Sequence, residues 1–195
     1  MQFPLDKKYN IIYADPPWKF GSKAPHLYGD TRFHSLDEQY QTQEKGWIAE
    51  LPVKQILHKD AACFMWTVDS HLEEALHVMR AWGFKFVNII FIWEKISKKG
   101  VTCCNVAPWV MKNYEICLFG TKGAMSKYKK KHNIQQKIRA IRRKHSQKPP
   151  CVRGRITALF GDLPRIELFA RERAKGWDAW GDECPEMEAT DVDRN

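Results

Sequence analysis

The apolar run of residues 9–12, Tyr-Asn-Ile-Ile, leads into Tyr13 and Ala14 and is closed by an acid and two consecutive prolines, and it limits the local fold more strongly than any other stretch. Such a run is typical of a buried strand, and proline ends a strand because it has no backbone N–H and fixes its own φ. The next four residues are Asp15, Pro16, Pro17 and Trp18. We therefore expect a stiff loop that holds a carboxylate, the carbonyls beside two prolines and an aromatic ring close together.

These residue types suit the recognition of an amine on a flat ring. The exocyclic amine of adenine is a poor nucleophile because its lone pair is delocalised into the purine. Hydrogen bonds to Asp15 and to the Pro16 carbonyl would aim that lone pair at a methyl group, and Trp18 would stack on the base. The loop thus predicts catalysis of adenine-N6 methylation by Asp15, Pro16, Pro17 and Trp18. The alternative is a turn with an aromatic plug.

The positive charge of the chain is concentrated in one segment. The net charge is +9, and residues 116–161 hold thirteen of the 32 Lys and Arg but no Asp or Glu. A charge run is often only a solvated face, but a segment of one sign also suits phosphate binding, so we predict a nucleic-acid partner. The predicted contacts in this segment are Lys129, Lys130, Lys131, Arg142 and Arg143.

Strand and helix patterns alternate along the chain. Further strands are expected at residues 61–68, 86–93, 114–119 and 165–171, and helices at residues 47–57, 71–82 and 152–160. Isoleucines at helical spacing also predict a helix within residues 129–144, in a basic insertion over about 122–147. This alternation is typical of an α/β fold with a mostly parallel sheet. Ligands bind there at the carboxyl ends of strands, where Asp15 and Arg171 both lie.

The length and composition of the chain limit its domain count, its metal content and its cellular location. A chain of 195 residues suits one domain, here residues 1–185 with a polar tail at 186–195. The six cysteines show no C-x-x-C spacing, so we predict reduced thiols and no metal. No apolar stretch approaches the roughly 20 residues that span a bilayer, and the first residues lack the apolar core of a secretion signal. We expect no membrane contact and a location in the cytoplasm of a bacterial or phage-infected cell.

The whole pattern resembles the DPPW family of S-adenosylmethionine-dependent adenine-N6 methyltransferases. This family includes the catalytic subunit of the eukaryotic mRNA adenosine methyltransferase and many bacterial and phage proteins. The resemblance covers nearly the whole chain, and its motifs stand in family order. They are residues 14–18, 64–66, 71–72, 81–84, Trp93 with Lys95, 115–123, 145–149, 167–171 and 176–183.

The resemblance implies a Rossmann-like fold in which the catalytic motif precedes the main cofactor motif. It also implies S-adenosylmethionine as cofactor, with Asp15 at the methionine amino group and Lys148 at the carboxylate. The stretch of residues 167–171 takes the main cofactor role. The residues implied for the cofactor are Asp15, Lys148, Glu167, Phe169, Arg171, Asp182 and Glu183.

Some of these residues have other interpretations. Glu167 and Arg171 suit a salt bridge at a strand end, and Lys148 suits a phosphate contact. Glu115 is a candidate acid on the substrate side, or a structural carboxylate at the start of a strand. Family members usually place Asn or Gln near one of the positions of Asp182 and Glu183, where this chain has two acids.

We therefore expect an adenine-N6 methyltransferase that acts on DNA. The compact chain and its likeness to stand-alone prokaryotic or phage members favour DNA, and RNA is the alternative substrate. A non-catalytic nucleic-acid-binding subunit is a second alternative, although the intact Asp-Pro-Pro-Trp argues against it. A small-molecule amine methyltransferase would leave the clustered cations without a role. A homodimer or a second subunit is also compatible with the aromatic content.

Overall fold

The computed structural model describes residues 2–18, 46–107, 109–143, 147–182 and 184 of the chain. Its strands are β1 (Tyr9–Ala14), β2 (Leu57–Thr67), β3 (Lys85–Ile96), β4 (Tyr114–Lys122), β5 (Lys137–Ile141), β6 (Arg165–Leu168) and β7 (Asp178–Trp180). Its α-helices are α1 (Trp47–Glu50), α2 (Leu72–Ala81) and α3 (Cys151–Phe160). Short 3-10 helices are η2 (Val53–Ile56), η3 (Asp69–His71) and η4 (Met125–Tyr128).

All seven strands form one sheet in the order β5-β3-β4-β2-β1-β6-β7. Strand β1 pairs in parallel with both β2 and β6, β6 with β7, and β3 with β5. Only β4 runs the other way, because it is antiparallel to both β2 and β3. The sheet is therefore mostly parallel, which confirms the predicted Rossmann-like α/β class.

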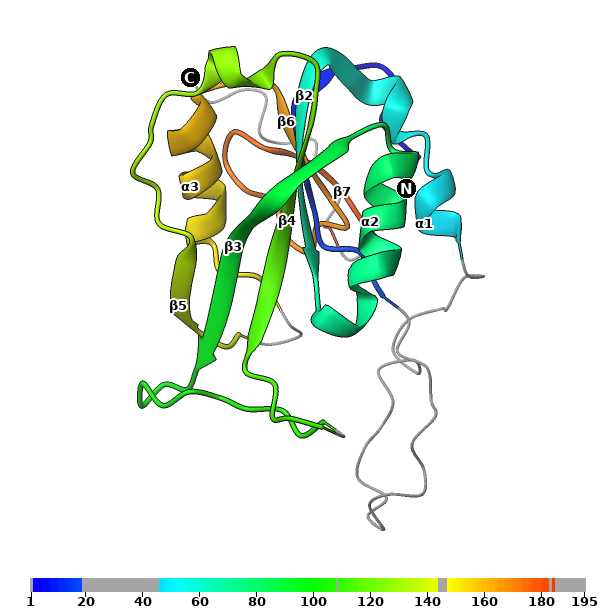
Figure 1. Cartoon of the computed structure of the whole chain (residues 1–195). Coiled ribbons are helices and arrows are strands. Elements are labelled where there is room, and N and C mark those ends of the chain that lie inside the picture. Colours follow the sequence, from blue (N-terminus) through cyan, green and yellow to red (C-terminus); the bar gives the residue numbers. More distant parts are fainter. Residues whose placement is uncertain (1, 19–45, 108, 144–146, 183, 185–195) are drawn as a thin grey trace.

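Helices cover both faces of this sheet (Figure 1). Side chains of β1 alternate between two hydrophobic clusters, as expected of a strand buried on both sides. Ile12 and Ala14 pack in the cluster beneath α1 and α2, whereas Ile11 and Tyr13 pack in the cluster beneath α3. The chain thus forms three layers, with the sheet in the middle.

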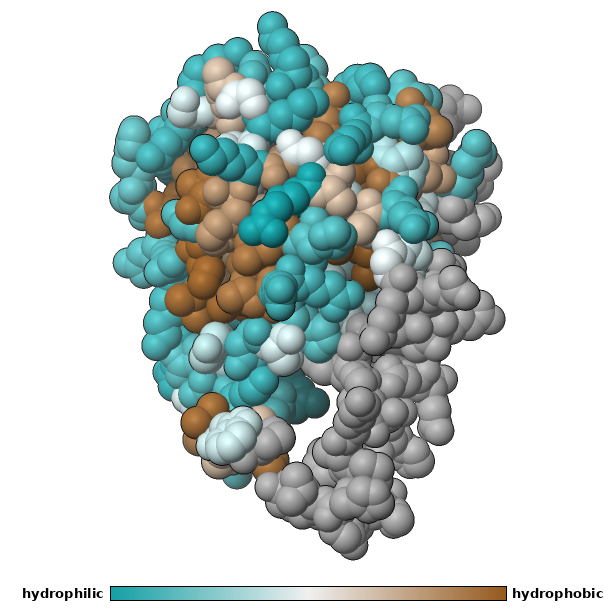
Figure 2. Space-filling model, turned by 45° about the vertical axis from the view of Figure 1, so that its right-hand side comes forward, coloured by the Kyte–Doolittle hydropathy of each residue, from teal (hydrophilic) through white to brown (hydrophobic). Residues whose placement is uncertain are grey.

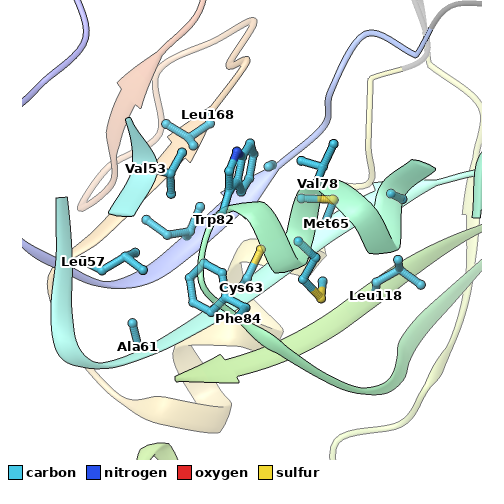
Figure 3. Packing of buried hydrophobic residues seen from close by; sticks show 14 of the residues in the cluster. Val53, Leu57, Ala61, Cys63, Met65, Val78, Trp82, Phe84, Leu118 and Leu168 are labelled. Atoms are coloured by element: carbon cyan, nitrogen blue, oxygen red, sulfur yellow. The ribbon is translucent and has the colours of Figure 1, made fainter. Parts of the chain in front are cut away.

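Trp82 anchors the layer of α1 and α2. Its side chain is fully buried, and its Nε1 donates a 2.8 Å hydrogen bond to the carbonyl of Ile48. Around it lie side chains from η2, from α2 and from the central strands, including Val53, Val78 and Met65 (Figure 3). One indole therefore joins α1 to the end of α2, because its buried N–H needs a partner.

The helix predicted over residues 47–57 is wrong in extent. The structure has the four residues of α1, then Pro52, then the 3-10 turn η2, and β2 already begins at Leu57. Proline lacks the N–H that a helix needs, and it disfavours helical φ and ψ in the residue before it. Leu51 accordingly adopts φ −52° and ψ 136°.

The helix predicted within residues 129–144 is also wrong. Residues 137–141 form the edge strand β5, which pairs with β3, and Ile138 is buried on the α3 side of the sheet. The open edge of β3 offers backbone partners that the weak helical spacing could not match. Strand β7, which pairs with β6, was not predicted from the sequence.

In the part of the chain that the structure describes, no helix is long and apolar enough to cross a membrane.

Candidate active site

The carboxyl edge of the sheet gathers residues from four distant segments. Asp15 follows β1, and Phe169 and Arg171 follow β6, its parallel neighbour. Because β4 is antiparallel to the other strands, its beginning, with Glu115, lies at this same edge. Lys148 lies in the segment that leads into α3. The topology therefore brings together most of the residues that the sequence assigned to catalysis and to the cofactor.

An alternating row of charges runs along this edge. The Lys148 ammonium lies 2.7 Å from both carboxylate oxygens of Asp15 and 3.2 Å from Oε2 of Glu115. On its other side, Glu115 forms an ion pair with Lys95. All four side chains are less than 20% exposed. The row is thus two carboxylates held by two ammonium groups in a largely dry environment.

Burial and these partners set the protonation of the row. Burial raises the pKa of Asp15, and the charge of Lys148 opposes this rise only in part. Burial also acts on Glu115, but there the charges of Lys148 and Lys95 outweigh it and lower its pKa. For Lys148, burial is outweighed by its two carboxylate partners, so its pKa is raised and it stays charged. Asp15 is therefore the acid of this row that protonates most easily.

The loop after β1 is held by its own backbone and by β2. The backbone N–H of Trp18 donates to the Pro16 carbonyl at 2.9 Å, and the Trp18 indole Nε1 donates to the Trp66 carbonyl at 2.9 Å. The Trp18 ring is stacked near the His71 ring, with centroids 6.3 Å apart and planes at 28°. The indole is thus fixed in orientation, and its ring also packs against the hydrophobic cluster beneath α1 and α2, so an aromatic plug stays an alternative to stacking on a base.

A hollow beside Asp15 is lined by five of the predicted cofactor residues, whereas Asp182 is not among the residues that line it. Phe169 has φ +61°, a left-handed conformation that is uncommon for a residue other than glycine. A Cβ on Gly181 would lie 2.5 Å from the backbone of Ala170, so glycine permits the close approach that sets Asp182 beside this turn. Glu183 lies outside the described residues. The hollow is lined by Tyr13, Asp15, Gln147, Lys148, Pro149, Arg153, Glu167, Phe169, Arg171 and Glu172.

Arg153 and Glu172 are the two charged lining residues that the sequence analysis did not predict for the site. The Nε atom of Arg153 donates to Oε2 of Glu167 at 2.6 Å, and its Nη1 donates to Oε1 of Glu172 at 3.0 Å. The salt-bridge partner of Glu167 is therefore Arg153 and not Arg171. Arg153 had been counted as one cation of the basic segment, and no local motif distinguishes it.

The cations that are predicted to bind nucleic acid form two groups, which lie at opposite ends of the parallel strands. Lys130 donates its backbone N–H to the Leu159 carbonyl at the end of α3, so Lys129, Lys130 and Lys131 lie at the edge away from Asp15. Strand β5 ends at the carboxyl edge. The following Arg142 and Arg143 therefore lie on the side of the site, and Nη1 of Arg143 is 3.9 Å from Glu172.

A hairpin arm of residues 97–113 joins β3 to β4 at the carboxyl edge (Figure 1). Paired backbone hydrogen bonds between Asn105 and Lys112 hold its two sides together. Hydrophobic side chains lie at its tip, at the bottom of the surface in Figure 2. The strongly exposed ones are Val101, Val106, Trp109, Val110 and Met111, and Trp109 is 95% exposed. The arm therefore presents an apolar surface near the site.

This sheet, with its charged row and aromatic loop at the carboxyl edge, places the chain among the Rossmann-like methyltransferases. The chain belongs to the MT-A70 family, whose sequence profile matches residues 9–183. It is 31% identical to the type II methyltransferase M.MunI of Mycoplasma sp. over 92% of this chain and 79% of that protein. It is 26% identical to the human N(6)-adenosine-methyltransferase catalytic subunit METTL3, over 84% of this chain but only 26% of that protein. It is also 25% identical to the Arabidopsis thaliana N6-adenosine-methyltransferase non-catalytic subunit MTB, over 67% of this chain but only 16% of that protein.

Family membership identifies the chain as an adenine-N6 methyltransferase that uses S-adenosylmethionine as methyl donor. The predictions of family, enzyme class and cofactor are thereby confirmed. Among the described residues, no group of three or more His, Cys, Asp or Glu side chains could hold a metal ion.

Proposed function

We propose that the chain methylates the N6 atom of adenine in DNA, with the chemistry centred on Asp15. The observation that carries this proposal is a buried carboxylate, paired with Lys148, directly beside an indole whose orientation is fixed. One group accepts hydrogen bonds from an amine, and the other stacks on the ring that bears it.

The charged groups of the hollow fit S-adenosylmethionine. Lys148 suits the carboxylate of its amino-acid part, and Asp15 suits the amino group. Glu167 suits ribose hydroxyls, with Phe169 and Arg171 on the adenosine side. When bound, S-adenosylmethionine supplies a methyl group on a positively charged sulfur. The chain's own residues then bind its two ends and keep water from the space between them.

Asp15 and Pro16 would orient the target amine. The Pro16 carbonyl already accepts one bond, from the Trp18 N–H, but a carbonyl has a second lone pair. An ionised Asp15 has about four acceptor positions, enough for Lys148 and for an amine hydrogen. With Trp18 stacked on the base, both hydrogens of the amine can be bound and its lone pair directed toward the methyl group. The contribution to methyl transfer is positioning and electrostatics. The sulfur would leave as a neutral thioether, and the methylated nitrogen would then lose one proton to water.

The choice of DNA rests on the relatives. The chain spans 79% of the type II methyltransferase M.MunI but only about a quarter of METTL3. RNA is the second candidate substrate, supported by similarity to the N6-methyladenosine RNA methyltransferase MTA1 of Pyricularia oryzae. The non-catalytic alternative, which MTB exemplifies, is opposed by the complete Asp15–Lys148 pair and by the intact loop. A homodimer or second subunit stays a prediction, for which the apolar arm supplies exposed surface.

The test is transfer of labelled methyl from S-adenosylmethionine to double-stranded DNA, single-stranded DNA and RNA in parallel, followed by nucleoside mass analysis. We expect N6-methyladenine in DNA. Asp15→Asn should lower the rate at least about a hundredfold. Asp162→Asn, which changes an acid that is 90% exposed at the other edge of the sheet, should leave it unchanged. Product in RNA alone would replace DNA as substrate, and wild-type transfer in Asp15→Asn would remove Asp15 from the mechanism.

A further inference from the structure

Arg153 connects three pieces of the hollow that come from different parts of the chain. It lies in the first turn of α3, directly after the segment that carries Lys148, and its side chain is 15% exposed. Its two hydrogen bonds reach Glu167 on β6 and Glu172 in the turn after β6. The turn between these two acids contains Phe169 and Arg171, so a single guanidinium ties the start of α3 to the whole cofactor segment.

We propose that Arg153 is a positioning residue for S-adenosylmethionine, acting through Glu167 and Glu172; this inference rests on the proposed function of the hollow. The bond to Glu167 fixes the direction of a carboxylate that is only 11% exposed and keeps acceptor capacity for two ribose hydroxyls, since a carboxylate has about four acceptor positions. The bond to Glu172 fixes the far end of the turn. The two bonds thus flank the turn in which Phe169 adopts its left-handed conformation.

The guanidinium is suited to this task in a way that lysine is not. Two N–H groups in a rigid planar fork reach two carboxylates at once and set the angle between them, whereas an ammonium is a point charge on a flexible stem. The fork is charged at all relevant pH values, so it also favours the ionised form of both acids.

The electrostatic surroundings of Glu167 give a readout that a purely structural role would not move. Burial raises the pKa of Glu167, and Arg153 opposes that rise. The titratable groups around Glu167 are Tyr13 on β1, Asp15 after β1, Arg153 on α3, Glu172 after β6 and Cys184 after β7. Of these, Arg153 is the cation that contacts the Glu167 carboxylate, and two further cations, Lys148 and Arg171, line the same hollow. Without Arg153, Glu167 protonates at a higher pH, and a protonated Glu167 is a poorer acceptor for ribose hydroxyls.

The test is calorimetric binding of S-adenosylmethionine across pH to the full chain and its variants. Arg153→Met should weaken binding about 10- to 100-fold at neutral pH and move the acid limb of the binding profile to higher pH. Arg153→Lys should keep the acid limb near its wild-type position but still bind several-fold more weakly, because the fork is lost. Glu172→Gln, which leaves the bond to Glu167 intact, should weaken binding only a few-fold without moving the limb.

Arg155→Met is the matched control. It removes the same charge two residues further along α3, where Arg155 donates to the carbonyls of Gln135 and Lys137 away from the hollow. Arg155→Met should bind S-adenosylmethionine with wild-type affinity, and the acid limb of its binding profile should lie at the wild-type pH. If folded Arg153→Met binds S-adenosylmethionine with wild-type affinity and an unmoved acid limb of the binding profile, the role of Arg153 is overturned. If Arg153→Met does not fold, wild-type binding by both Arg153→Lys and Glu172→Gln overturns it. Failure of the wild type itself to bind S-adenosylmethionine would instead overturn the proposed function.

Discussion

At the scale of single residues, Lys148 decides whether Asp15 can act. Its ammonium contacts Asp15 and Glu115 and is 10% exposed, so it neutralises two buried acids at once. In Lys148→Met, Asp15 loses the positive group that contacts it and keeps the negative Glu115. Its raised pKa must then rise further, because burial and Glu115 both act in that direction while Arg171 alone opposes them.

We therefore predict that the acid limb of the pH–rate profile moves to higher pH in Lys148→Met, since Asp15 must be ionised to accept amine hydrogens. Loss of a buried ionic partner should also lower the free energy of unfolding by about 3–5 kcal/mol. Lys112→Met removes an exposed pair with Asp69 and should cost about 1 kcal/mol or less, with an unmoved limb. An unmoved limb in Lys148→Met would mean that the limb reports another group.

Trp18 has two functions that two substitutions can separate. Trp18→Phe keeps an aromatic ring but loses the Nε1 bond to the Trp66 carbonyl, whereas Trp18→Ala removes the ring as well. If the ring stacks on the target base, Trp18→Ala should raise KM for DNA about 10- to 100-fold, since such stacking contributes about 1–3 kcal/mol. Trp18→Phe should raise it less, because only the fixed orientation is lost. Equal, small effects in steady-state kinetics would indicate an aromatic plug.

At the scale of elements, the central strands could be predicted from the sequence because they are buried. Residues 9–12 and 61–68 are largely apolar runs, and they lie in β1 and β2, which are parallel neighbours. The strands that the sequence did not predict, β5 and β7, are the two edge strands of the sheet. Strand β5 is mostly exposed, and its pairing with β3 selects an extended conformation. Strand β7 has three residues, too few for a pattern.

The site could likewise be predicted only in part from the sequence. Asp15, Trp18 and Glu167 belong to local motifs that a sequence shows directly. The bridge from Arg153 to Glu172 depends on the packing of α3 against β6, and the reversed direction of β4, which brings Glu115 to the carboxyl edge, depends on sheet topology. Residues joined only by tertiary packing carry no spacing signal.

Cations follow β5 at the carboxyl ends of the parallel strands, and other cations follow η4 at the opposite ends of these strands. Substitutions in the two groups should therefore affect DNA binding differently. If the DNA backbone passes the catalytic edge, changing both Arg142 and Arg143 to Gln should reduce the slope of log affinity against log salt by about 2. The matched change of Lys129 and Lys130 to Gln removes the same charge at the far edge and should alter the slope less. A larger effect from the lysine pair, measured by titration at several salt concentrations, would place the DNA along the far edge.

At the scale of the whole molecule, strands that are neighbours in the sheet come from distant parts of the chain. Strands β1 and β6 are adjacent in the sheet although about 150 residues separate them in the chain. The catalytic loop after β1 and the cofactor turn after β6 therefore face one hollow, with Lys148 closing it from the start of α3. A ligand that contacts all three segments is expected to stabilise the molecule as a unit, because the unfolded chain offers no such site.

This coupling can be measured by thermal unfolding with and without ligand. S-adenosylmethionine at about a hundred times its Kd should add about 2.7 kcal/mol, which for a chain of this length corresponds to a rise in Tm of roughly 5–10 °C. Adenosine alone engages only the side of the hollow formed by Glu167, Phe169 and Arg171. It should therefore raise the Tm of Lys148→Met as much as that of the wild type, while S-adenosylmethionine at the same concentration raises the Tm of Lys148→Met less. Glu167→Gln should show the reverse pattern, with the response to adenosine lost. If both variants lost both responses equally, the two halves of the hollow would not bind separate parts of one ligand, and the division of roles between Lys148 and Glu167 would be wrong.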